Sequence, residues 1–73
     1  MITHRDLEEV KYLCKLKEPT VFQMRQLIKL RLKAEGNQNN YIRLQYLTDD
    51  QVISGFKIAK QHFNEPESKE LHS

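Results

Sequence analysis

The sequence predicts a small all-α fold, a bundle of three to four short helices, with a monomer and a homodimer both left open. A threonine stands three residues before an acidic or amide side chain at Thr3, Thr20 and Thr48, which is the capping-box spacing of a helix start. Apolar residues recur at intervals of three and four after Thr3 and Thr48. A chain of 73 residues buries only about 60% of the surface that its unfolded form exposes, so a second copy could complete the core.

The first helix is predicted from about Thr3 to Lys17. Its apolar face is formed by Leu7, Val10 and Leu13. Acidic side chains in the first turn and lysines in the last turn both oppose the helix dipole. Pro19 then interrupts the helix, because proline disfavours the helical conformation of the residue before it.

The second helix is predicted from Phe22 to Glu35, a segment composed almost entirely of good helix formers, with Gly36 as a left-handed C-cap. The alternative is an α+β fold with a hairpin near residues 28–46, since residues 28–33 and 41–46 both alternate like strands. The helix is favoured because Ile28 is the only β-branched residue after Val21 in this segment.

Residues 36–40 are polar and aperiodic, and they predict a loop. A short helix is favoured over an extended segment for residues 41–47. The last helix is predicted over residues 49–63, with Gly55 at a close helix crossing. Residues 1–63 would then form a single helical domain, and residues 64–73 a disordered acidic tail. The apolar stripe of the last helix consists of Val52, Phe56, Ala59 and Phe63.

Positive charge is concentrated in one part of the chain. The net charge is +2, yet residues 11–33 carry seven lysines and arginines against one glutamate. We expect the cations of the first two helices to converge on one face that meets nucleic acid or an acidic protein surface. Two solvated helix faces would give the same pattern. A base-stacking single-strand binder is disfavoured, because no aromatic residue is expected on the basic face. The candidate nucleic-acid-binding residues are Lys11, Lys15, Arg25, Lys29, Arg31 and Lys33.

Several apolar residues lie outside the stripes that are assigned to the core. On a domain of this size such residues either fill the second side of a helix or form an exposed patch, and exposed patches mark partner surfaces. We expect some of them to bind a second copy or another protein. The candidate partner-binding residues are Leu30, Tyr41, Tyr46 and Ile58.

No pattern indicates an enzyme or a cofactor. Cys14 lies on the apolar stripe, which favours a small core residue over a reactive thiol. The three histidines lack the spacing of a metal pair, and two glycines are too few for a phosphate-binding loop. The sequence therefore predicts no metal, no cofactor and no small-molecule substrate. A single cysteine, no apolar stretch near 20 residues and no signal peptide favour a cytoplasmic protein without a membrane span.

One segment carries a family resemblance. Leu47-Thr48-Asp49-Asp50-Gln51, followed by Ala59 and His62, resembles a stretch of the Hha/YmoA family of small nucleoid-associated modulators. The similarity covers residues 47–62, and Gln61 stands where the family has an acidic residue. It implies a protein that acts on transcription through a larger DNA-binding partner.

These features together predict a small non-enzymatic regulator, of the transcription type, that binds nucleic acid or an acidic protein surface through its basic face. The alternative is an adaptor or inhibitor of a larger protein machine that acts through an exposed apolar patch.

Overall fold

The computed structural model describes the backbone of residues 2–72 and the side chains of residues 2–64, and it confirms a small all-α bundle. No strand occurs within residues 2–72, so the hairpin alternative for residues 28–46 is wrong. The predicted short helix after the polar loop is present as α3. The elements are α1 (His4–Lys15), α2 (Val21–Ala34), the 3₁₀ helix η1 (Gln38–Asn40), α3 (Tyr41–Leu44) and α4 (Asp49–His72).

Each of the three longer helices begins with the predicted capping box. The threonine hydroxyl accepts a hydrogen bond from the backbone N–H three residues later at 3.1–3.2 Å. The side chain of that later residue accepts one from the threonine N–H at 2.8–3.0 Å. Two of the N–H groups that a helix start leaves unpaired are thus satisfied each time. The pairs are Thr3–Asp6, Thr20–Gln23 and Thr48–Gln51.

The end of α2 is set by Gly36, as the sequence predicts. Its φ is +77°, in the left-handed region that favours glycine. The N–H of Gly36 donates to the carbonyl of Lys33 at 3.1 Å, and the N–H of Asn37 donates to the carbonyl of Leu32 at 2.8 Å. This is the Schellman arrangement, and it turns the chain into the loop that leads to α3.

The predicted bounds differ from the structure mainly in α4. α1 ends at Lys15, because the backbone of Leu16 is already extended. α4 continues to His72, although the apolar stripe predicted an end near Phe63. Pro66 removes one helix donor and no apolar period continues beyond Phe63, which is why the sequence indicated an end there. Disorder of residues 64–73 in solution stays a prediction.

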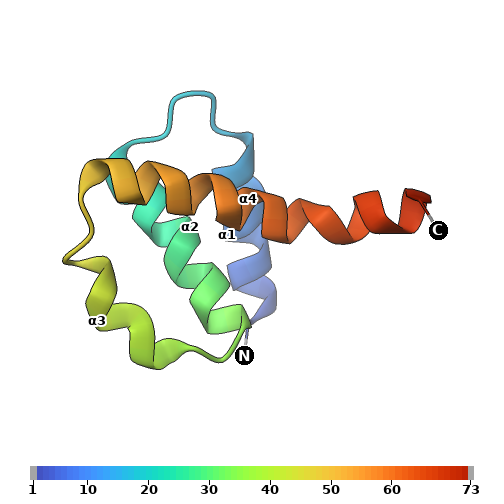
Figure 1. The fold of residues 1–73 in the computed structure, drawn as a ribbon. Coiled ribbons are helices and arrows are strands. Elements are labelled where there is room, and N and C mark those ends of the chain that lie inside the picture. The colour runs from blue at the N-terminus through green and yellow to red at the C-terminus, as the bar shows by residue number, and fades with distance from the viewer. Residues whose placement is uncertain (1, 73) are drawn as a thin grey trace.

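α2 is the central helix. It packs against α1, α3 and α4, and α4 crosses it and continues past the body of the protein (Figure 1). A Cβ on Gly55 would lie 3.0 Å from Cδ1 of Ile28, so the predicted close crossing is confirmed between α2 and α4. Leu27 and Val52 are fully buried at the centre of this packing. The buried core consists of Val10, Leu13, Leu27, Ile28, Leu30, Val52, Phe56 and Ala59.

Candidate functional site

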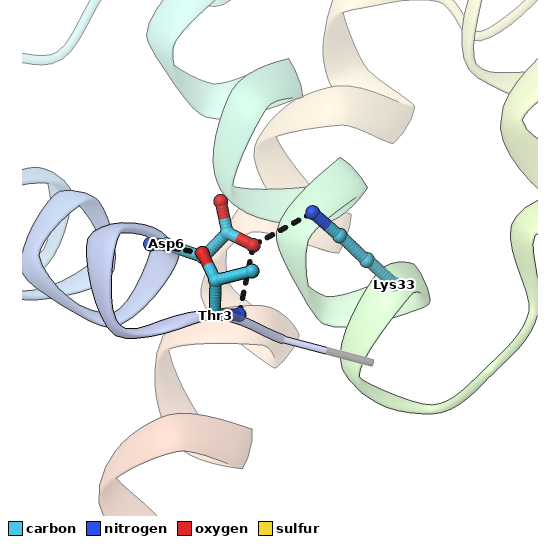
Figure 2. A network of polar contacts seen from close by, with 3 residues as sticks. All are labelled: Thr3, Asp6 and Lys33. Atoms are coloured by element: carbon cyan, nitrogen blue, oxygen red, sulfur yellow. Dashed lines mark hydrogen bonds and ion pairs between the residues drawn. The ribbon is translucent and has the colours of Figure 1, made fainter.

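Lys33, a predicted nucleic-acid-binding residue, is partly buried and forms an ion pair within the fold. Its Nζ donates to Oδ2 of Asp6 at 2.7 Å, and the same oxygen accepts from the N–H of Thr3 at 3.0 Å (Figure 2). These two hydrogen bonds, first that of Lys33 and then that of Thr3, lower the pKa of Asp6 to about 2. The pair ties the start of α1 to the end of α2, so the two helices run antiparallel.

Arg25 is also engaged within the fold. Its guanidinium donates to the backbone carbonyl of Leu44 and, at 2.9 Å, to that of Leu47. Leu44 is the last residue of α3, where helix carbonyls lack helical partners, and Leu47 lies between α3 and α4. Arg25 therefore fastens α3 and the segment after it to α2.

The other two cations of α2, Arg31 and Lys29, differ in their exposure and in their partners within the fold. A nitrogen of the Arg31 guanidinium lies 3.5 Å from Oε2 of Glu35, and its Nε is buried without a hydrogen-bond partner among the described residues. Lys29 is exposed, and its Nζ lies 5.3 Å from the centre of the Tyr41 ring, within range of a cation–π interaction. Lys29 is thus the one α2 cation, within the part of the chain that the structure describes, that is exposed at the surface without an ion pair.

The predicted cations of α1 are exposed. Val10 and Leu13 turn towards the core, and at 100° per residue Lys11 and Lys15 point away from it into solvent. Lys11 lies 4.0 Å from a carboxylate oxygen of Glu8. The convergence of the two basic ridges on one face stays a prediction.

The predicted partner-binding residues are scattered. Leu30 is only 7% exposed and belongs to the core, so its assignment to a surface patch is wrong. The reason is that α2 packs against helices on several sides, which buries a wider arc of its surface than the sequence indicated. Tyr41 is half-buried beneath Lys29. Tyr46, in the turn after α3, and Ile58, on α4, are exposed at 76% and 50%.

A hollow of the described surface lies between α2 and α3, with a volume of about 390 Å³. Phe22 and Ile42 at its edges are 71% and 66% exposed, which is unusual for side chains of this size. Its lining contains two cations and no carboxylate. We call it the α2–α3 groove; it is lined by Phe22, Arg25, Gln26, Lys29, Tyr41, Ile42, Leu44 and Gln45.

The groove combines three predicted site residues, Arg25, Lys29 and Tyr41, with five that the sequence analysis did not select, Phe22 and Ile42 among them. Phe22 is three residues before Arg25 and seven before Lys29, so the three share one ridge of α2. That spacing was visible in the sequence and contradicts the expectation that the basic face lacks aromatic residues. Ile42 carried no such signal, because only the docking of α3 brings it beside α2.

Cys14 and the potential metal ligands are the candidates for reactive chemistry in the sequence. Cys14 is half-buried, and burial raises the pKa of its thiol, although the nearby positive charge of Lys60 acts in the opposite direction. The thiol is therefore protonated near neutral pH. Among the residues that the structure describes, no three histidine, cysteine, aspartate or glutamate side chains gather to hold a metal ion. None of the described helices is both long enough and apolar enough to cross a membrane.

No family model, no curated protein and no solved structure matches this chain. The resemblance of residues 47–62 to the Hha/YmoA family is therefore not supported by any of these comparisons.

Proposed function

We propose that this protein is a small non-enzymatic binding module that holds a segment of a partner protein in the α2–α3 groove, as an adaptor or inhibitor does. The segment presents apolar side chains to the groove and a carboxylate to Lys29. The observation that carries the proposal is the lining of the groove: exposed apolar side chains beside cations, with no carboxylate among its eight residues.

The apolar side chains supply the affinity in this proposal. Phe22 and Ile42 are large and mostly exposed, and covering them removes apolar surface from water. Isolated exposed apolar residues are normal, but these two border the same hollow. Lys29, whose exposed ammonium lies over Tyr41, would favour an acidic segment and reject a basic one.

The charge distribution favours a protein over nucleic acid as the occupant. Phosphate binding strengthens with each cation that is free to neutralise a phosphate. Arg25, Arg31 and Lys33 each have a partner within the fold, and Lys11 and Lys15 face away from the groove. Lys29 is left as the exposed groove cation, which is too little for a phosphate-binding face.

Selection from a random 12-residue peptide display library tests the proposal. We expect enrichment of peptides with apolar and acidic residues, and the loss of their binding in Ile42→Asp and Lys29→Glu variants. The matched controls are Ile58→Asp, an exposed isoleucine outside the groove, and Lys11→Glu. No enrichment, or enriched peptides that bind the Ile42→Asp variant as well as wild type, would refute the proposal.

An oligonucleotide arm separates the two kinds of occupant. Labelled duplex and single-stranded DNA are titrated with the protein at about 50 and 200 mM salt, because phosphate binding weakens steeply with salt. We expect no salt-dependent DNA binding. Micromolar DNA binding that Lys29→Glu removes would assign the groove to nucleic acid instead.

A further inference from the structure

A second hollow of about 190 Å³ adjoins the α2–α3 groove on the side of α1. The two hollows share Gln26, Lys29 and Tyr41, so a segment in the groove lies next to this second space. α1 contributes Asp6 and Glu9 to it, and neither residue lines the groove. The second hollow, which we call the polar pocket, therefore has the carboxylates that the groove lacks.

Four charged side chains line the polar pocket: the carboxylates of Asp6 and Glu9, and the ammonium groups of Lys29 and Lys33. Asp6 and Lys33 form an ion pair at 2.7 Å and neutralise each other. Glu9 is half-buried, and its carboxylate has no hydrogen-bond or ion-pair partner among the described residues. Partly desolvating a carboxylate without a partner is unfavourable, and a cation placed beside it would offset that cost.

We infer that the partner segment bound in the α2–α3 groove also inserts one basic side chain, lysine or arginine, past Tyr41 into the polar pocket, where it pairs with Glu9. This inference rests on the proposed function of the groove. The ring of Tyr41 lines the path between the two hollows and is a favourable surface for a cation. The partner segment would thus carry apolar residues, an acid for Lys29 and a base for Glu9.

The size of the pocket suits a side chain. Its volume equals that of about six water molecules at liquid density, roughly 30 Å³ each, which leaves room for a basic head group and the end of its stem. Glu9 would repel an acidic side chain at the same place, whereas Lys29 attracts one on the groove side. The two residues, on different helices, would fix the direction of the bound segment.

Parallel peptide-library selections on wild type, Glu9→Gln and Glu9→Lys proteins test this inference. Wild type should enrich lysine or arginine at one peptide position, Glu9→Gln should lose that preference, and Glu9→Lys should replace it with aspartate or glutamate. Glu8→Gln is the control: Glu8 neighbours Glu9 on α1, is exposed and does not line the pocket, so its selection should resemble that of wild type.

The enriched peptide and its base-to-glutamine version are then compared by fluorescence anisotropy. The change should weaken binding to wild type about fivefold, the effect of a partly exposed ion pair, and binding to Glu9→Gln less than twofold. Equal affinity of the two peptides for wild type would overturn the inference and leave the groove proposal intact. A library with no enrichment on wild type would overturn both.

Discussion

The attachment of α3 to α2 can be tested through one residue. Arg25→Met keeps the aliphatic stem of the side chain and removes the guanidinium that donates to the carbonyls of Leu44 and Leu47. None of the four residues of α3 is fully buried, and Leu44 is the one of them that packs against the core, so apolar packing replaces these hydrogen bonds only in part. We expect α3 to open locally while α1, α2 and α4 stay folded.

The size of the effect follows from the two hydrogen bonds. A bond from a charged donor stabilises by about 1.5–3 kcal/mol when buried, and the half-buried position of Arg25 reduces this to about 1 kcal/mol each. The loss is then about 2 kcal/mol in the free energy that holds α3, or roughly a 30-fold change in its opening equilibrium. Because the opening is local, the stability of the core should change much less.

Hydrogen exchange measured by NMR gives the readout. The amides of Tyr46 and Leu47 donate to carbonyls of α3, at 3.1 and 3.4 Å, and should exchange about 30-fold faster in Arg25→Met. Arg43→Met is the matched control, because Arg43 lies on α3 with an exposed side chain that has no partner among the described residues. Unchanged exchange at these amides in Arg25→Met, or equal acceleration in Arg43→Met, would refute the role given to Arg25.

Two further predictions concern the stability of the whole fold. Leu27→Ala should lower the free energy of unfolding by about 3 kcal/mol, because Leu27 is fully buried. Leu7→Ala should lower it by less than about 1 kcal/mol, because the Leu7 side chain is 42% exposed. Urea unfolding measures both losses, and equal losses would contradict the assigned core. The pKa of Asp6 is lowered from 3.8 to about 2, so its pair with Lys33 stabilises the folded state above about pH 4 and is lost as the pH falls towards 2. Asp6→Asn should remove this part of the acid dependence of the melting temperature, and an unaltered acid profile in the variant would show that Asp6 is not its source.

The starts of the helices were predictable because their signals are local. Thr20 and Gln23 are three residues apart, and they meet as soon as the first turn forms, whatever the rest of the chain does. Gly36 acts in the same way, through the conformation of its own backbone. The apolar stripe of α4 also identified its buried residues, since a helix facing one neighbour buries one stripe.

The partners of the cations could not be predicted, because helix docking decides them. Lys33 and Asp6 are 27 residues apart, and Arg25 is 19 residues from Leu44, so no local pattern pairs them. A helical wheel places Lys29 and Lys33 on one basic ridge, but it does not show that Asp6 of α1 pairs with Lys33 or that Lys29 lies over Tyr41 of α3.

Capping and periodicity depend on neighbours three and four residues apart, so local patterns are enough to predict capped helices with a basic second helix. Local patterns do not show which cations lack a partner in the fold, that Leu30 belongs to the core, or that Phe22 and Ile42 border one groove. Those properties arise when α1, α3 and α4 dock on α2, since an ion pair or a hollow between helices requires side chains that are distant in the chain to meet in space.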